Sequence, residues 1–166
     1  MPPTTDQQWL NDEEQAAWRA WQRMHLQLTG RLNRQLAEES GISLQDYGVL
    51  VTLTDRADGR MRAFELGREL GWEKSRLSHH VSRMVERGFV TRERCPTDQR
   101  GLFIAVTPKG RAAIEAAAPG HVAEVRRSFI DLLTPEQLRA VAEVAGVVLD
   151  ALAEECARAV PEAPDA

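Results

Sequence analysis

The strongest constraint on the fold is a change of pattern in the middle of the chain, where helical spacing gives way to strand spacing. An apolar-rich segment over residues 64–70 ends at Gly71, and helical spacing then resumes and stops at Gly88. After Gly88 apolar and polar residues alternate over residues 89–94 and 102–107, which predicts two strands joined by a polar linker. The predicted order of two short helices, a glycine turn between them and a β-hairpin is that of a winged helix-turn-helix.

Glycine favours a close crossing of these two helices. Gly67 stands four residues before the turn, where two closely packed helices leave no room for a large side chain. Gly71 gives the turn the backbone freedom that it requires. The apolar side chains of both helices are expected to form a shared core, made of Leu66, Leu70, Leu77, Val81 and Met84.

The outer face of the second helix carries small hydroxyl groups and cations. Such a helix fits the major groove, which is about 12 Å wide and presents hydrogen-bonding base edges. Arg76 can donate two hydrogen bonds to a guanine, while the serines and Lys74 can bind phosphates or bases. The candidate DNA-contacting residues are Lys74, Ser75, Arg76, Ser78, His79 and Arg83. Winged helices also mediate protein contacts, so a protein-interaction module without DNA affinity is the alternative.

The distribution of charge supports a nucleic-acid partner, although the net charge does not. The 166-residue chain has a net charge of −4. Residues 61–111, however, hold 11 Lys and Arg against 6 Asp and Glu, a net charge of +5, which leaves −9 on the remainder. Such asymmetry indicates nucleic-acid binding. A basic patch that is merely solvated is the alternative.

The tip of the predicted hairpin holds a second candidate DNA contact. Asp98 and Arg100 lie two residues apart after Pro96, so the carboxylate can orient the guanidinium outward. Arg100 is then expected to enter a minor groove, where narrow A·T-rich segments concentrate negative potential. An ion pair without consequence is the alternative. Arg92 and Arg94, on one face of the preceding strand, extend the basic stripe.

Two helices are predicted before this motif. Residues 11–39 repeat apolar side chains at spacings of three and four, which is typical of a long amphipathic helix. Ser43 and Asp46 have the spacing of a reciprocal helix cap, and the second helix is expected to run to about residue 56.

Two further helices are predicted after the hairpin. Thr107 followed by Pro108 indicates a helix start, and Pro119 predicts a kink or a brief interruption near the middle of that helix. Thr134 and Gln137 have the spacing of a cap for the last helix.

Composition and motifs argue against several other classes of protein. No stretch reaches the roughly 18 apolar residues of a membrane span, and residues 1–8 lack a secretory signal, so we expect a cytoplasmic protein with no membrane partner. No nucleophile elbow, phosphate-binding glycine loop or metal-spaced ligand set is present. His79 and His80 point about 100° apart on a helix and share no ligand face. We therefore expect no catalysis, no cofactor and no metal.

Five segments of the sequence together carry a resemblance to a known family. They are residues 65–71 (ELGRELG), 74–78 (KSRLS), 83–90 (RMVERGFV), 98–100 (DQR) and 106–110 (VTPKG). In order and spacing they resemble the MarR (multiple antibiotic resistance regulator) family of bacterial transcriptional regulators. The similarity extends over about residues 11–155.

The resemblance implies a mainly α-helical fold with a small β-hairpin wing, and a homodimer whose two winged lobes read a palindromic operator in double-stranded DNA. The recognition helix would be residues 74–87 and the wing arginine Arg100. Family members often have Arg at the position of His79 and a buried aliphatic residue at that of His80. His80 is therefore expected to be partly buried and hydrogen-bonded.

The same resemblance predicts the division of the chain. Residues 43–107 are expected to form the DNA-binding domain. The helical dimerisation region is expected to comprise residues 11–42 and 108–156, and residues 1–10 and 157–166 are expected to be flexible tails.

An effector is also implied, since family members commonly bind phenolic or other aromatic anions between the dimer helices and the winged lobe. The candidate ligand-binding residues are Trp18, Arg19, Trp21 and His25 on the first helix and Tyr47 on the second. The alternative is that a stripe of Trp and Leu at helical spacing forms core or dimer seam.

The favoured function is a dimeric repressor that is released from its operator by a small aromatic ligand. A redox-switched regulator is a third hypothesis, because some MarR-like proteins sense oxidants through a cysteine. Residues 9–24 contain none, and the candidate is Cys95 at the base of the wing.

Arg100→Ala is expected to weaken operator binding most where the flanking sequence is A·T-rich, because a narrow minor groove attracts the guanidinium. Titration of duplexes that differ only in their flanks measures this effect. An unchanged affinity would remove the wing from the mechanism.

Overall fold

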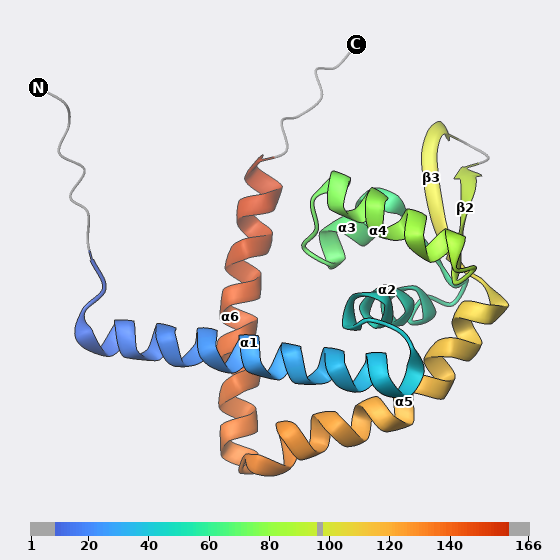
Figure 1. Ribbon diagram of the computed structural model, residues 1–166. Helices are drawn as coiled ribbons and strands as arrows, with labels where there is room; N and C mark the ends of the chain where they lie inside the picture. Colours follow the sequence, from blue (N-terminus) through green and yellow to red (C-terminus); the bar gives the residue numbers. More distant parts are fainter. Residues whose placement is uncertain (1–8, 96–97, 160–166) are drawn as a thin grey trace, which may run out of the picture. The chain divides into compact units, whose positions relative to one another are not determined.

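The structure, a computed structural model, describes residues 9–95 and 98–159, without the side chains of residues 95, 98–100 and 156–159. The chain divides into two compact units, Met1–Glu124 and Val125–Ala166, and the predicted tails lie largely outside the described residues. In chain order the elements are α1 (Asp12–Ser40), α2 (Leu44–Thr54), β1 (Arg60–Arg62), α3 (Ala63–Glu69), α4 (Lys74–Glu86), β2 (Val90–Cys95), β3 (Asp98–Val106), α5 (Pro108–Ser128), a short 3-10 helix (Ile130–Leu132) and α6 (Pro135–Ala159) (Figure 1). The expected mainly helical fold with a small wing is confirmed.

Reciprocal caps define where the first two helices begin. The Glu14 N–H donates to the Asn11 side chain at 2.9 Å, and the Asn11 N–H donates to the Glu14 carboxylate at 2.8 Å. The predicted cap of α2 is confirmed, because the Asp46 N–H donates to Ser43 Oγ and the Ser43 N–H donates to Asp46 Oδ2, both at 3.0 Å. These bonds satisfy N–H groups that have no partner within the helix.

The turn between α3 and α4 has the glycine geometry that the sequence predicts. Gly71 has a φ of 62°, a left-handed conformation that favours glycine. A Cβ at Gly67 would lie 3.2 Å from the Trp72 carbonyl oxygen and 3.4 Å from Leu77 Cδ2, so the close approach is also confirmed. The two glycines allow a short turn between α3 and α4 and a close contact between the two helices.

The wing is a three-stranded antiparallel sheet in the order β1-β3-β2. β1 is not predicted from the sequence, because three residues are too few to show an alternating pattern; it lies along β3, with Arg60 opposite Ala105. The predicted linker is too long, since β2 continues to Cys95 and β3 begins at Asp98. Backbone pairing extends the strands into this polar sequence, with a shift of register between Arg94 and Cys95.

Thr107 joins the end of the wing to the start of α5. Its hydroxyl donates to the Gly88 carbonyl at 2.7 Å and accepts from the Gly110 N–H at 3.0 Å, which confirms the predicted helix start. α5 continues through Pro119, so the predicted interruption does not occur, whereas the alternative of a kink agrees with the change of direction of α5 in Figure 1. A proline removes one N–H donor from the helix, and the neighbouring hydrogen bonds are enough to continue it here.

The cap of α6 is also as predicted from the sequence. The Thr134 N–H donates to Gln137 Oε1 at 2.9 Å, and the Gln137 N–H donates to Thr134 Oγ1 at 3.3 Å. Pro135 is the first residue of the helix, where its missing N–H costs nothing.

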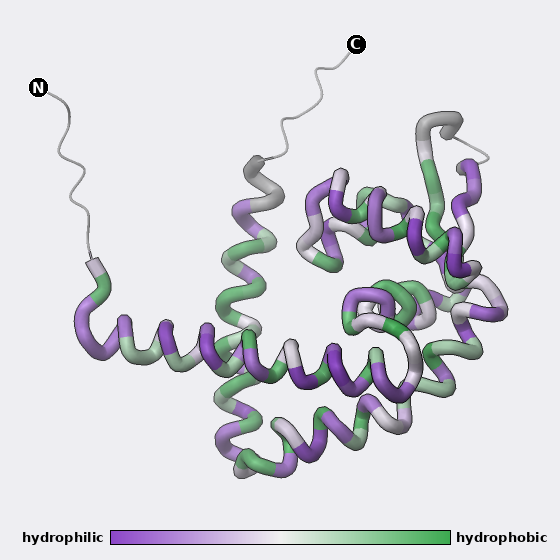
Figure 2. The backbone as a smooth tube through the Cα atoms, viewed as in Figure 1, coloured by the Kyte–Doolittle hydropathy of each residue, from purple (hydrophilic) through white to green (hydrophobic). Residues whose placement is uncertain are grey.

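One apolar core holds α1 to α5 and the base of the wing together. The predicted residues of α3 and α4 belong to it: Leu66, Leu77, Val81 and Met84 are buried, and Leu70 packs against them partly buried. Figure 2 shows hydrophobic positions alternating with hydrophilic ones along these helices. The remaining buried members are Leu36, Ile42, Val49, Leu50, Leu53, Met61, Phe89, Val90, Ile104, Ile114 and Ala117.

Gly110→Ala is expected to lower the free energy of unfolding by about 3 kcal/mol. A Cβ at this position would lie 2.1 Å from the Phe89 carbonyl oxygen, so the backbone must move. Urea unfolding at fixed protein concentration measures the change. Gly30→Ala is the control, since its nearest atom is the flexible end of Arg34 at 3.8 Å, and we expect it to raise stability by about 0.5–1 kcal/mol. Equal effects of the two substitutions would contradict the close packing at Gly110.

Candidate nucleic-acid interface

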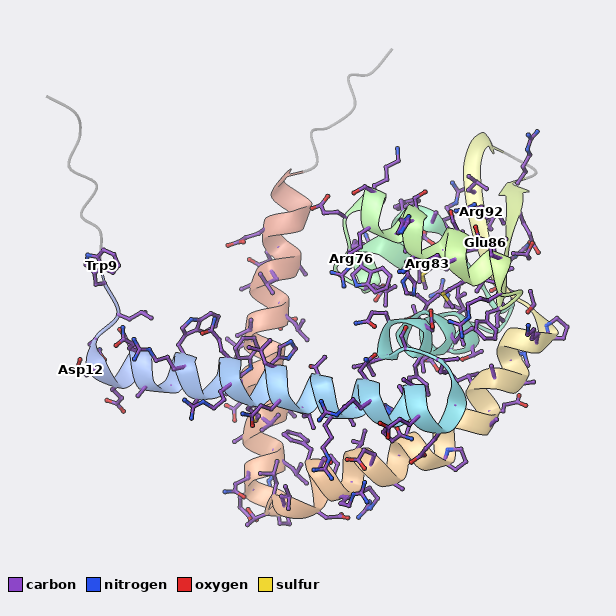
Figure 3. The ribbon with its side chains drawn as sticks, in the orientation of Figure 1. Trp9, Asp12, Arg76, Arg83, Glu86 and Arg92 are labelled. Carbon is purple, nitrogen blue, oxygen red and sulfur yellow. The ribbon has the colours of Figure 1, made fainter. Side chains whose placement is uncertain are left out.

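The outer face of α4 is polar and exposed, whereas its inner face is buried. Leu77, Val81 and Met84 lie in the core at helical spacing. This burial turns the six candidate residues of α4 toward solvent, namely Lys74, Ser75, Arg76, Ser78, His79 and Arg83. Arg76 and Arg83 extend from α4 itself, and Arg92 approaches from the adjacent strand (Figure 3). The structure therefore brings most of the predicted reading surface together on one helix.

A groove runs along each side of α4. One, with a volume of about 480 Å³, is lined by the start of α2 and by Arg76, His79 and Arg83. The other, of about 660 Å³, lies between α3, α4 and the wing, with Phe64 and Leu102 in its wall. Since both flanks are hollowed, α4 stands out as a ridge, the shape that a major groove admits.

Arg92 connects the wing to α4. Its Nη2 donates to the Ser78 carbonyl at 3.1 Å and to Ser82 Oγ at 2.7 Å. Arg94 lies two residues further along β2 and is exposed. Arg92 therefore binds two serines of α4, in addition to its predicted role as a cation of the basic stripe.

The predicted contacts at the wing tip fall on side chains that the structure does not describe. Asp98 and Arg100 lie in β3, and Cys95 ends β2. The orientation of Arg100 by Asp98 and the redox role of Cys95 stay predictions.

A buried carboxylate anchors α4 to the junction of α1 and α2. Asp46 is only 4% exposed, and its Oδ2 accepts from Arg87 Nη1 at 2.7 Å. Arg87 Nη2 also donates to the Gly41 carbonyl at 2.6 Å, where α1 has just ended. Asp46 therefore does more than cap α2: one guanidinium beyond the end of α4 joins three helices.

His80 completes this anchor from the inner side of α4, and the expectation that it is partly buried and hydrogen-bonded is confirmed. Its Nε2 lies 3.0 Å from Asp46 Oδ1, and Arg83 Nη2 lies 3.1 Å from its Nδ1. Because a guanidinium has only donors, Arg83 donates to Nδ1, and Nε2 faces Asp46. The sequence does not reveal this cluster, because Asp46 already has a local role as the cap of α2.

The pKa of Asp46 follows from this environment. Burial by itself acts to raise it, but hydrogen bonds from His80, Ser43 and Arg87 outweigh the burial and hold the pKa of the carboxyl well below its usual range. The ionised form is therefore the one that the fold stabilises.

The candidate ligand residues separate into two places. Trp18, Trp21 and His25 form a stacked ladder on α1, with ring centroids 5.2 and 5.4 Å apart in sequence order. Tyr47 packs instead against His121 of α5, with centroids 4.3 Å apart. Burial raises the pKa of Tyr47 and lowers that of His121. Arg19 is exposed on α1, and a ligand role for these residues stays a prediction.

The described residues hold neither a metal-ligand cluster nor a membrane-spanning helix. Within residues 9–95 and 98–159, no cluster of three or more His, Cys, Asp or Glu side chains is placed to hold a metal ion. No helix in the same ranges is long and apolar enough to cross a membrane.

Comparison with known proteins gives concordant matches. A family model described as MarR family matches residues 40–101. AbsC, a MarR family transcriptional regulator from Streptomyces coelicolor, is 39% identical, with a TM-score of 0.83 over 89% of this chain and 99% of its own. Sco3205, another from the same organism, solved in complex with DNA, is 40% identical, with a TM-score of 0.83 over 87% of this chain and 94% of its own.

A curated relative matches over a shorter region. YkoM from Bacillus subtilis (strain 168), described as an uncharacterized HTH-type transcriptional regulator, is 25% identical over 101 residues. That match covers 61% of this chain and 64% of YkoM, so it spans less than two thirds of the relative.

Asp46→Asn is expected to lower the free energy of unfolding by about 2 kcal/mol at pH 7, because Arg87 and His80 lose a charged acceptor. The folded-state pKa of Asp46 lies below its unfolded value of 3.8, so the carboxylate stabilises the fold above that value and this contribution is lost as the pH falls through the folded pKa. Urea unfolding from pH 7 to pH 2 should therefore show a constant difference between the two proteins above the unfolded pKa of 3.8 and convergence below it.

Asp55→Asn is the matched control for this comparison, because Asp55 is an exposed carboxylate at the other end of α2. We expect it to change stability by no more than about 0.5 kcal/mol. A difference between wild type and Asp46→Asn that stays constant with pH would show that the charge of Asp46 is not what anchors α4.

Proposed function

The chain belongs to the MarR family of transcriptional regulators, and from this premise we propose that it binds operator DNA sequence-specifically through α4. The observation that carries the proposal is the division of α4 into a buried apolar face and an exposed face of cations and hydroxyls. Residues 61–111, with their net charge of +5, place this face in the basic part of an acidic chain. Sco3205, which is 40% identical, was solved in complex with DNA.

Base edges and phosphates would be contacted by different parts of this surface. Arg76, in the first turn of α4, is placed to donate two hydrogen bonds to a guanine edge. Lys74 and Ser75 lie at the N-terminus of α4, where exposed N–H groups and the helix dipole favour a phosphate. Arg94 and Arg100 extend the contact along the wing to the neighbouring minor groove.

Exposed apolar side chains on α1 and α6 support a homodimer. Trp18 and Trp21 on α1 are 49% and 50% exposed, and Val147 on α6 is 68% exposed. Figure 2 shows hydrophobic residues recurring along both helices. Patches of this kind are uncommon on a monomer. A second copy would cover them and present two α4 helices to the two halves of a palindromic operator, one helical turn apart.

In the proposed regulation, the dimer represses a promoter by occupying it and a small aromatic ligand releases it. The ladder of Trp18, Trp21 and His25 offers ring faces for stacking, and Arg19 offers a cation for an anionic group. A dimer seam is the competing role for the same side chains. A titration of the tryptophan fluorescence with aromatic carboxylic acids discriminates the two roles. A ligand site gives a saturable change in fluorescence, whereas residues that only form a dimer interface do not respond to the acid.

The purified protein is expected to bind a duplex from its own upstream region with an affinity that falls steeply with salt, because cations displace counterions from the phosphates. Arg76→Ala should cost about 1–3 kcal/mol on that duplex and relax the preference at one base pair in each half-site. Electrophoretic or fluorescence-anisotropy titrations at two salt concentrations measure both effects.

Arg139→Ala is the control, since it removes the same charge from an exposed arginine at the start of α6. We expect it to leave DNA affinity unchanged. If the wild-type protein shows no salt-sensitive DNA binding, a protein-interaction module becomes the better account. Equal losses for Arg76→Ala on operator and random DNA would instead make Arg76 a phosphate contact.

A further inference from the structure

Trp72 lies in the turn between α3 and α4, directly beneath the first exposed arginine of the recognition surface. The guanidinium carbon of Arg76 sits 4.7 Å from the centre of the Trp72 ring, a cation–π contact. Arg76 is exposed, while Trp72 is half-buried and packs against the core. The base-reading candidate therefore rests on an aromatic platform.

The platform is itself held in place from two directions. The Trp72 N–H donates to the Gly67 carbonyl at 2.8 Å, which fixes the backbone of the turn. The ring also contacts His80 edge-on, with centroids 5.0 Å apart and an interplanar angle of 77°. His80 in turn lies between Asp46 and Arg83.

Trp72, Arg76 and His80 are spaced four residues apart, so they follow one side of α4 and the turn before it. An outer arginine, a half-buried indole and a buried imidazole thus follow one another from solvent to the Asp46 anchor. Each member limits the movement of the next. Arg76 therefore has an aromatic partner in the protein without DNA.

We propose that Trp72 is a positioning residue that sets the direction of the Arg76 guanidinium, and thereby the base preference of α4. The inference rests on the proposed DNA-binding function and deepens it. Two parallel hydrogen bonds to a guanine require the planar guanidinium to lie in the plane of the base. A free arginine loses side-chain entropy when it adopts one such orientation, whereas a stacked one has already lost much of it.

This role separates specificity from affinity. Removing the indole leaves the charge of Arg76 in place, so attraction to phosphates and the salt dependence of binding are unchanged. What is lost is the alignment that distinguishes guanine from the other bases. Trp72 therefore acts on the ratio between affinities for correct and incorrect operators.

The test compares wild type, Trp72→Leu, Trp72→Phe, Arg76→Ala and the double variant Trp72→Leu/Arg76→Ala. The probes are the duplex that the wild-type protein selects from a random library, the same duplex with the Arg76-dependent base pair changed in each half-site, and a random duplex. Binding is titrated at two salt concentrations. Thermal unfolding of each variant accompanies the titrations, because Trp72 also contacts the core.

Trp72→Leu should lower the ratio of affinities for the selected and changed duplexes by about threefold to tenfold. Affinity for the random duplex and the salt slope should match wild type. Trp72→Phe keeps a weaker aromatic platform and should give an intermediate ratio. In the Arg76→Ala background, Trp72→Leu should have no further effect on the ratio, because its effect passes through Arg76.

An unchanged ratio for Trp72→Leu overturns the proposal, and so does an equal loss in the presence and absence of Arg76. A loss of the same size on selected and random duplexes also overturns it, because Trp72 would then contribute to affinity alone. If Trp72→Leu does not fold, Trp72→Phe replaces it in the test. A ratio of affinities for the selected and changed duplexes equal to that of wild type would then contradict the proposal. A wild-type protein that prefers no duplex would instead contradict the proposed function itself.

Discussion

The arrangement of the reading surface depends on one buried carboxylate. Asp46 caps α2 through Ser43, accepts from Arg87 just beyond the end of α4, and lies against His80 on the inner side of the same helix. Arg87 also bonds the Gly41 carbonyl. A buried charge is costly unless it is paired and hydrogen-bonded. These contacts of Asp46 tie α4 to the junction of α1 and α2, while burial of the apolar face of α4 leaves its cations exposed.

The anchor and the proposed readout belong to one chain of contacts. Asp46 fixes His80, the His80 ring meets the edge of Trp72, and Trp72 carries Arg76 on its face. On the other side of α4, Arg92 ties the wing to Ser78 and Ser82. Buried and half-buried contacts thus connect the Asp46 anchor to the exposed arginine.

Most of the fold follows from local signals that the sequence displays openly. The caps at Ser43 and Thr134, the glycine geometry at Gly71 and the two faces of α4 depend on residues within a few positions of each other. The contacts of Asp46 with Arg87 and with His80, which anchor α4, do not follow from local signals. Asp46 and Arg87 are 41 residues apart, and Asp46 already has a local interpretation as the cap of α2.

The same limit explains the other differences. β1 has three residues, and only its pairing with β3 identifies it as a strand. The cation–π contact is between neighbours four residues apart, yet it depends on how the turn at Gly71 presents Trp72. The exposed apolar residues of α1 belong to the predicted helical stripe, but the stripe alone does not distinguish a dimer seam from a ligand site.

The central claim, that an anchored α4 and its wing read DNA, is tested most directly by hydrogen–deuterium exchange of the protein with and without the duplex it selects. The account predicts added protection in α4 and in the β2–β3 hairpin, with α1 and α6 unchanged by DNA. Protection that appears only on α1 and α6, or nowhere, would contradict it.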